Sequence, residues 1–305
     1  MAESCTATAV FMDTLVSIEV VHSAVSDDCS EAVERAFEWF REVEQRCSRF
    51  DQVSELVRLS RHVGETVEVS TLLYRAIEFA VAVAAASGGA FDPTIGRRLE
   101  AAGFNESYLT GERTDSGIDP KVSTTYRDVI LDPARRTVTL RRPVLLDLGA
   151  VAKGLAIDLA AQELQPFGNF AIDAGGDLFV RGMNPAGEPW VVGVRHPRED
   201  DAVFETLYLT DVAVCTSGDY ERRRRDGEPG HHILEPLSGQ SADKAISVTV
   251  VAPTAMAADA LATAAFVLGP AEGMALLEKE GVEGLIVSSS LERFDTPGLA
   301  RYLAR

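Results

Sequence analysis

The chain has 305 residues, of which 46% are hydrophobic and 25% are charged, a composition typical of a globular protein. Its 47 acidic residues outnumber the 29 Lys and Arg residues, which gives a formal net charge of −18. This charge argues against a nucleic-acid partner, because proteins hold phosphate backbones by neutralising them with Lys and Arg. No stretch approaches the roughly 18 uninterrupted apolar residues of a membrane-spanning helix, so we expect no membrane insertion.

The N-terminus and the cysteines suggest a reduced, cytoplasmic protein. The opening residues MAESCTATAV lack a basic start followed by an apolar run, so they do not resemble a secretory or lipoprotein signal. The four cysteines, at positions 5, 29, 47 and 215, show no CxxC spacing. They therefore indicate neither a zinc site nor a disulfide framework.

The first half of the chain predicts a strand, two helices and a hairpin. Residues 9–21 are rich in β-branched side chains and partly alternate, which favours a strand. Residues 27–47 carry apolar side chains at helical spacing, and a second helix should begin at Ser70 and Thr71 and extend to about residue 86. Within residues 128–146 the sequence DPARR separates two Val/Leu-rich runs, a pattern typical of a hairpin.

The second half mixes helices and strands without strict alternation. The helices are expected near residues 151–165, 254–267 and 270–280, and the strands near 169–181, 189–195, 204–215, 245–252 and 283–288. This order predicts an α+β fold with a mixed, largely antiparallel sheet and packed helices. No linker rich in Pro, Ser or Gly interrupts the chain, so we expect a single domain over residues 1–305. This domain could consist of two lobes around a cleft.

Asp259 and Thr263 lie four residues apart in the predicted helix over residues 254–267. Side chains at this spacing share one helical face. Together they offer two hard oxygen ligands, which Mg²⁺ and Ca²⁺ accept. The alternative is structural, with Asp259 capping a turn and Thr263 bonding back to a helical carbonyl.

Five further segments contain specialised turns. They are AFDPTIG at 90–96, LLDLGAVAKGLAIDLA at 145–160, AIDAGGDLFVRG at 171–182, TSGDY at 216–220 and HHILEP at 231–236. Each one alone is ordinary turn chemistry. In this order and spacing, however, they resemble the ApbE-type family of FAD:protein FMN transferases, and the resemblance covers about residues 12 to 269.

Four positions depart from the usual strings of that family. Asp13 stands for its common Gly, Asp173 for its Asn, Glu235 for its Asp, and Ser60 where an Asn often occurs. The pair Asp259 and Thr263 is intact. We therefore expect these departures to affect the positioning of flavin or acceptor more than metal binding.

The resemblance implies an enzyme that transfers FMN from FAD to a Thr or Ser hydroxyl of an acceptor protein and releases AMP. It implies a Mg²⁺ ion, replaceable by Mn²⁺, held by the Ala150 carbonyl, Asp259 and Thr263. The FAD-binding residues that it implies are Met12, Ala90, Phe91, Asp92, Lys153, Asp177, Ser217, Gly218 and Ile233. With the resemblance, the metal interpretation of Asp259 and Thr263 outweighs the structural one.

Three further assignments each keep an alternative. Phe50 could stack on the isoalloxazine ring, or be an ordinary core residue. His232 is the first candidate for accepting the hydroxyl proton, with Asp177 as a rival base and a structural role as the alternative. The basic run at residues 222–225 is either a solvated surface or an attraction for FAD phosphates or an acidic acceptor.

Two other functions compete with the transferase. A metal-dependent FAD pyrophosphatase giving FMN and AMP would use the same ligands, with water in place of the acceptor hydroxyl. A non-catalytic flavin-binding protein is the third possibility. The presence of both Asp259 and Thr263 argues against this third one.

Overall fold

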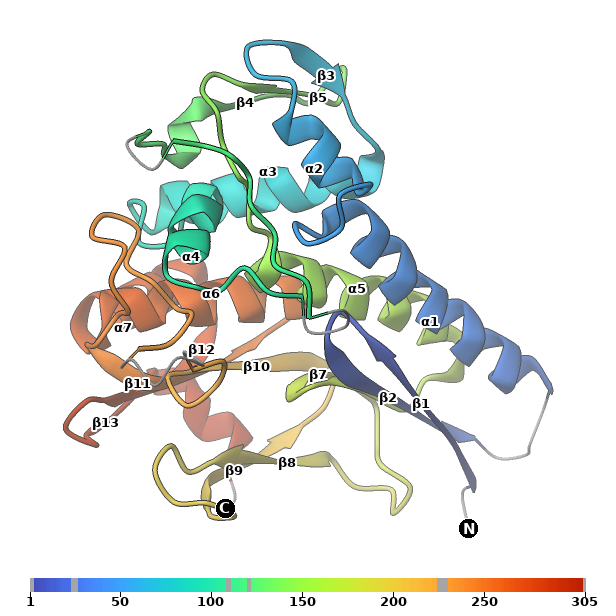
Figure 1. The fold of residues 1–305 in the computed structure, drawn as a ribbon. Coiled ribbons are helices and arrows are strands. Elements are labelled where there is room, and N and C mark those ends of the chain that lie inside the picture. The colour runs from blue at the N-terminus through green and yellow to red at the C-terminus, as the bar shows by residue number, and fades with distance from the viewer. Residues whose placement is uncertain (1–2, 23–26, 108–110, 120–121, 224–229, 304–305) are drawn as a thin grey trace.

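An eight-stranded antiparallel sheet forms the centre of the computed structural model, which describes residues 3–22, 27–107, 111–119, 122–223 and 230–303 (Figure 1). Its strands, in spatial order, are β1 (Glu3–Phe11), β2 (Thr14–His22), β6 (Phe170–Ala174), β7 (Asp177–Arg181), β10 (Val212–Gly218), β11 (Ala245–Ala252), β12 (Glu283–Ser288) and β13 (Arg293–Asp295). Every neighbouring pair is antiparallel. The predicted α+β fold with a largely antiparallel sheet is therefore confirmed.

Helices cover one face of this sheet, and a small hairpin covers the other (Figure 1). The helices are α1 (Asp27–Cys47), α2 (Glu55–Ser60), α3 (Thr71–Ala86), α4 (Gly96–Ala101), α5 (Gly149–Leu164), α6 (Ala255–Leu268) and α7 (Pro270–Glu280). The short 3-10 helices are η1 (Pro93–Ile95), η2 (Tyr126–Asp128), η3 (Gln165–Phe167) and η4 (Pro297–Tyr302). The remaining strands are β3 (Thr66–Glu68), β5 (Thr137–Leu140) and β4 (Val129–Asp132) in a three-stranded sheet, and β8 (Trp190–Arg195) paired with β9 (Val203–Leu209).

Strand β11 is buried along its whole length because both faces of the sheet are covered. Val248 and Val250 belong to the large core between the sheet and the helices. Val251 points the other way, into a smaller core with Trp190 and Leu299. A strand buried on both faces appears in the sequence as a continuous apolar run, as AISVTVVA does.

Three predicted strands are wrong in the same way, because each one is a pair of strands around a tight turn. In residues 169–181 this turn is Gly175-Gly176, between β6 and β7. The other two turns have no glycine. Residues 9–21 contain the turn Met12-Asp13, with φ of 50° and 61°, between β1 and β2. Residues 204–215 contain the turn at Asp211, with φ of 55°, between β9 and β10. Neither turn has the Gly that usually signals a left-handed backbone, and Asp tolerates this conformation.

Other predicted elements are confirmed within a few residues. The helix from residue 27 to 47 is α1, and Ser70 caps α3 by accepting the backbone N–H of Leu73 at 3.2 Å. The expected hairpin around DPARR is β4 and β5. In the part of the chain that the structure describes, no helix is both long and apolar enough to cross a membrane.

Helices α5 and α6 pack with their backbones in direct contact at Gly154. A Cβ atom at this position would lie 2.5 Å from the backbone nitrogen of Met256. We expect Gly154→Ala to destabilise the protein by about 1–3 kcal/mol, because the two helices would have to separate. Urea denaturation measures this loss, and Gly193→Ala is the control, since its Cβ would meet Val203 at an ordinary 3.4 Å.

Candidate functional site

Lys153, Asp177 and Asp259, which are far apart in the sequence, form one charged cluster above the sheet. Lys153 on α5 pairs with the carboxylate of Asp177 at the start of β7, and its Nζ lies 3.6 Å from Oδ2 of Asp259 on α6. The other carboxylate oxygen of Asp177 accepts the backbone N–H of Thr216 at 3.3 Å. Three predicted site residues, contributed by two helices and a strand, are therefore brought together.

The turn before Asp177 places it beside the β1–β2 hairpin. Gly175 and Gly176 have φ of 64° and 92°, in the left-handed region that favours glycine. A Cβ at Gly175 would overlap the Thr14 side chain, so only glycine allows the two turns to lie this close. The glycine pair thus sets the distance between Met12, on the first hairpin, and Asp177.

Asp259 is not a helix cap. Thr254 caps α6 by accepting the backbone N–H of Ala257 at 3.3 Å, so the capping interpretation of Asp259 is wrong. Asp259 is buried one turn further along, and its Oδ2 has no hydrogen-bond partner among the described residues. Burial raises the pKa of Asp259, while the positive charges of Lys153 and Arg222 act to lower it.

Thr263 faces the same region as Asp259. Its hydroxyl lies 3.2 Å from that of Ser217 at the end of β10, so it has a side-chain partner across the site. A buried carboxylate oxygen without a hydrogen bond, with two hydroxyls nearby, is a suitable set of hard donors for a cation such as Mg²⁺.

The described residues contain no group of three or more His, Cys, Asp or Glu side chains that could hold a metal. A site here would therefore depend on Asp259, the Thr263 hydroxyl and backbone oxygen. Ala150, the predicted carbonyl donor, lies in the first turn of α5, one turn before Lys153. One carboxylate with neutral oxygens fits Mg²⁺, which usually keeps several waters and binds substrate phosphates.

The two adjacent histidines have different environments. The His231 ring is buried edge-on against Phe266, and its nitrogens bond the Ala242 carbonyl at 2.9 Å and the Ile233 N–H at 3.3 Å. Burial lowers the pKa of His231. Both ring nitrogens of His231 are thus occupied within the fold, which is a structural role.

His232 faces the other way, with its ring edge-on to Phe104 at 6.4 Å. Burial lowers the pKa of His232 to about 3, and the charges of Arg222 and His231 act in the same direction. The Glu221 carbonyl bonds the ring, while Nδ1 has no partner among the described residues. A neutral imidazole with a free nitrogen is able to accept a proton.

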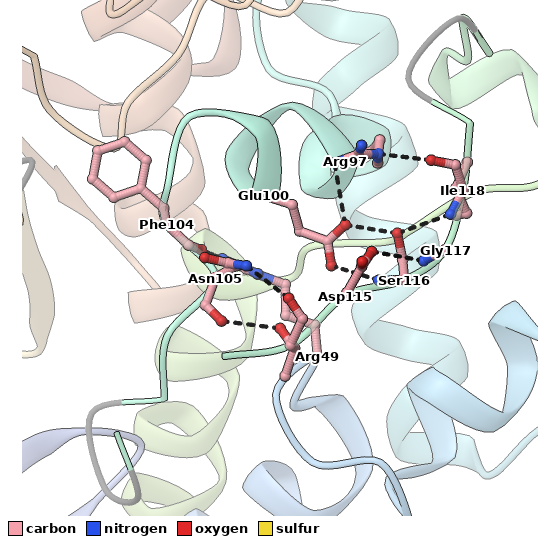
Figure 2. Close-up of polar contacts among 10 residues, drawn as sticks. Arg49, Arg97, Glu100, Phe104, Asn105, Asp115, Ser116, Gly117 and Ile118 are labelled. Atoms are coloured by element: carbon pink, nitrogen blue, oxygen red, sulfur yellow. Dashed lines mark hydrogen bonds and ion pairs between the residues drawn. The ribbon is translucent and has the colours of Figure 1, made fainter. Parts of the chain in front are cut away.

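Arg49 is a site residue that the sequence did not predict. Its buried guanidinium donates to the Asp147 carboxylate and, at 2.5 Å, to the Phe104 carbonyl, as Figure 2 shows for the latter. The guanidinium also stacks over the Phe50 ring, 4.1 Å from its centroid. Arg49 therefore joins Phe50, the DLGAVAKG turn and the Phe104 segment beside His232.

A second part of this network holds the chain that follows Phe104. Glu100 is buried and accepts the Ser116 backbone N–H at 3.0 Å and its hydroxyl at 2.6 Å, while Arg97 donates to the Ile118 carbonyl at 2.8 Å (Figure 2). These bonds secure the loop against α4. The network could not be predicted, because its partners are in a loop with no periodic pattern.

Ala90 and Asp92 of the predicted FAD-binding stretch border a cavity of about 360 Å³, together with Glu235 and Pro236 of HHILEP, whereas Phe91 is buried in the large core. The Asp92 carboxylate is already occupied, since it accepts the Thr94 N–H at 2.9 Å and the Tyr126 N–H at 2.9 Å. Its side chain holds the cavity wall in place, which leaves backbone groups and Ala90 for contacts with a ligand.

Met12 and Ile233 are both held by backbone hydrogen bonds. The Met12 N–H donates to Glu44 of α1 at 3.0 Å, and the Ile233 carbonyl accepts the Ala242 N–H at 3.0 Å. Gly218 lies directly under Tyr220, where a Cβ would meet the ring at 2.5 Å.

The side chains or backbone at the four departures from the family strings have defined conformations or hydrogen bonds. Asp13 adopts the left-handed φ of 61° that glycine favours, and Asp173 accepts the Gly176 N–H at 2.8 Å. Glu235 accepts the Ser238 hydroxyl at 2.6 Å, and Ser60 donates to the Leu56 carbonyl within α2. Ser60 therefore bonds its own helix.

The predicted basic run at residues 222–225 is described only in part. Arg222 and Arg223 are exposed, and residues 224 and 225 lie outside the described residues. Arg222 acts electrostatically on Asp13, His232 and Asp259, so its charge is directed toward the site.

The chain is similar in sequence to known proteins of one family. The model of the ApbE family matches residues 12–286. A relative from Treponema pallidum, named FAD:protein FMN transferase, is 33% identical over 297 residues, covering 90% of this chain and 82% of its own. A relative of the same name from Vibrio cholerae is 31% identical over 261 residues, covering 83% of this chain and 78% of its own.

Solved structures show the same fold. The ApbE protein of Thermotoga maritima superposes with a TM-score of 0.87 at 34% identity, covering 99% of this chain and all of its own. The flavin transferase ApbE of Vibrio cholerae gives a TM-score of 0.86 at 26% identity, with the same coverage. The match in sequence over most of the chain, and in fold over nearly all of it, shows that this chain is an enzyme of the ApbE family.

Proposed function

We propose that this enzyme transfers FMN from FAD to a Thr or Ser hydroxyl of an acceptor protein, with Mg²⁺ or Mn²⁺, and releases AMP. The observation that carries the proposal is the buried Oδ2 of Asp259, which forms an ion pair with Lys153 but has no hydrogen-bond partner among the described residues. The name of its relatives, FAD:protein FMN transferase, supports FAD as the donor and a protein as the acceptor. We place the reaction in the cytoplasm and in a single domain.

The reaction is a displacement at the phosphorus of the FMN half of FAD. The acceptor hydroxyl oxygen forms the new P–O bond, the bond from that phosphorus to the AMP phosphate breaks, and AMP leaves with the bridging oxygen. Asp259, Thr263 and the Ala150 carbonyl would hold the ion, which supplies neutralisation of charge on the pyrophosphate when bound. Lys153 brings a further positive charge to the same place.

His232 would take the proton of the attacking hydroxyl. Its ring is neutral at physiological pH, since burial holds its pKa near 3, and Nδ1 is free of protein partners in the described chain. Asp177 is the rival base, but its carboxylate is paired with Lys153 and bonded to Thr216. We favour His232, which has a ring nitrogen without a hydrogen-bond partner among the described residues.

The flavin would lie between the β1–β2 turn at Met12 and the Phe50 ring. Arg49 occupies one face of that ring. An isoalloxazine would stack on the other face. The remaining FAD contacts of the proposal are Ala90, Phe91, Asp92, Lys153, Asp177, Ser217, Gly218 and Ile233.

A metal-dependent FAD pyrophosphatase would use the same residues with water as the attacking group. The two functions differ in the fate of the FMN, which is attached to the acceptor protein by the transferase and released by the pyrophosphatase. When the enzyme is incubated with FAD, Mg²⁺ and an acceptor protein, we expect the acceptor to become heavier by the mass of FMN. Mass spectrometry of the intact acceptor detects this change. Release of free FMN with an unmodified acceptor would favour the pyrophosphatase.

FMN should not replace FAD as the donor, because breaking the pyrophosphate drives the displacement and AMP is its leaving group. We expect no adduct when the acceptor is incubated with FMN, Mg²⁺ and enzyme. Isothermal calorimetry should show FAD binding weakened about tenfold or more by Lys153→Ala, through loss of a charge-assisted contact to phosphate. An adduct formed from FMN alone would contradict the displacement.

A further inference from the structure

A carboxylate on α5 joins this helix to the start of α6. Asp158 accepts the backbone N–H of Ala255 through Oδ1 at 2.7 Å and that of Met256 through Oδ2 at 3.0 Å. Both N–H groups belong to the first turn of α6, where a helix has no internal acceptors for them. A carboxylate at a helix N-terminus is also favoured by the helix dipole.

This contact is an unusual cap, because it comes from another helix. Thr254, which precedes α6, is the local cap, and its hydroxyl accepts the Ala257 N–H of its own helix. Asp158 instead ties α6 to α5 at one fixed position and one orientation, since its two oxygens bond two consecutive N–H groups.

A second close contact between α5 and α6 lies beside Asp158. One turn earlier on α5, Gly154 brings the backbones of the two helices into direct contact at Met256. Gly154 limits how closely the helices approach, and Asp158 determines the register in which they meet.

The two helices tied in this way carry opposite halves of the proposed metal and phosphate site. Ala150 and Lys153 belong to α5, and Asp259 and Thr263 belong to α6. Asp259 follows Ala255 by one helical turn, so a shift of the first turn of α6 moves the Asp259 carboxylate with it. The distance from Lys153 Nζ to Asp259 Oδ2, now 3.6 Å, is the quantity that such a shift would change.

We propose that Asp158 is a positioning residue that sets the register of α6 on α5 and thereby the arrangement of the metal ligands. This inference rests on the proposed function, since it concerns the same ion. It assigns to Asp158 a role without contact to metal or substrate.

The test is the affinity for Mn²⁺, measured from the electron paramagnetic resonance signal of free Mn²⁺ at pH 8 with FAD present and no acceptor protein. We expect Asp158→Ala to weaken Mn²⁺ binding about tenfold or more, as loss of residues that orient metal ligands does. Asp158→Asn, which keeps one acceptor oxygen, should bind Mn²⁺ better than Asp158→Ala. Neither variant removes a proposed ligand.

Thr254→Ala is the matched control, because it removes a cap from the same helix but no tie to α5. We expect its Tm to fall while its Mn²⁺ affinity stays within about twofold of wild type, since losing a residue that orients metal ligands typically costs about tenfold or more. If Asp158→Ala binds Mn²⁺ like wild type, or if Thr254→Ala weakens binding equally, Asp158 only stabilises the fold and the inference is wrong. Failure of the wild-type enzyme to bind Mn²⁺ would instead contradict the proposed metal site itself.

Discussion

Asp259→Ala should lower AMP release from FAD by about 10³-fold, because it removes the only carboxylate among the proposed metal ligands. Charge neutralisation by an ion at a transferring phosphoryl group is worth several kcal/mol, and about 4 kcal/mol corresponds to this factor. AMP release is measured by chromatography at increasing Mg²⁺ concentrations, with and without EDTA. The wild-type enzyme should lose activity in EDTA and recover it with added Mg²⁺ or Mn²⁺.

The loss of activity should not come from loss of the fold. Because burial raises the pKa of Asp259 above that of the unfolded chain, its ionisation costs stability as the pH rises through the folded pKa. The isosteric variant Asp259→Asn should therefore have a Tm at pH 7.5 no lower than that of wild type. Asp173→Asn, which removes a charge on the neighbouring β6 and keeps an acceptor for Gly176, is the control with near-wild-type activity. An Asp259→Ala enzyme that releases AMP at the wild-type rate in EDTA would rule out the metal assignment.

Regular patterns predicted the long helices well, whereas the short helices α2 and α4 and the turns without glycine were missed. The helix over residues 27–47 and the helix capped by Ser70 follow directly from apolar spacing and cap chemistry. The turns at Met12-Asp13 and Asp211 hold left-handed residues other than glycine, which composition does not reveal. Their conformation is imposed by strand pairing on either side, a tertiary effect.

The charged cluster was predicted through resemblance, whereas its supports were not. Lys153, Asp177 and Asp259 stand in recognisable strings, and the fold brings them together. Arg49 and Asp158 act through partners 55 to 98 residues away in the sequence. In a sequence, a single Arg or Asp of this kind cannot be told from a charged residue exposed to solvent. Only the packed structure reveals what it contacts.

His232→Ala should lower transfer to the acceptor by about 10² to 10⁴-fold, the usual contribution of a general base, with FAD affinity changed only a few fold. A base acts on the transition state, so kcat falls and donor binding does not. Because burial first, and then Arg222 and His231, lower the pKa of His232 to about 3, the ring remains neutral throughout the neutral range. The wild-type rate should therefore show no fall from His232 protonation between pH 8 and pH 5.

His231→Ala is the matched control, and stability against pH separates the two roles. His231 bonds Ala242 and Ile233, so its loss should lower the Tm and leave the rate per folded enzyme nearly unchanged. Because folding lowers the pKa of His232, the protein loses stability as the pH falls from 6.5, the pKa of the unfolded histidine, toward 3. In this range the unfolded chain binds the proton and the folded chain does not. His232→Ala should remove part of this acid destabilisation and also lower transfer by the factor given above. If His232→Ala transfers FMN at the wild-type rate from pH 6 to 9, Asp177 becomes the better proton acceptor, because its carboxylate is the other candidate base in the cluster.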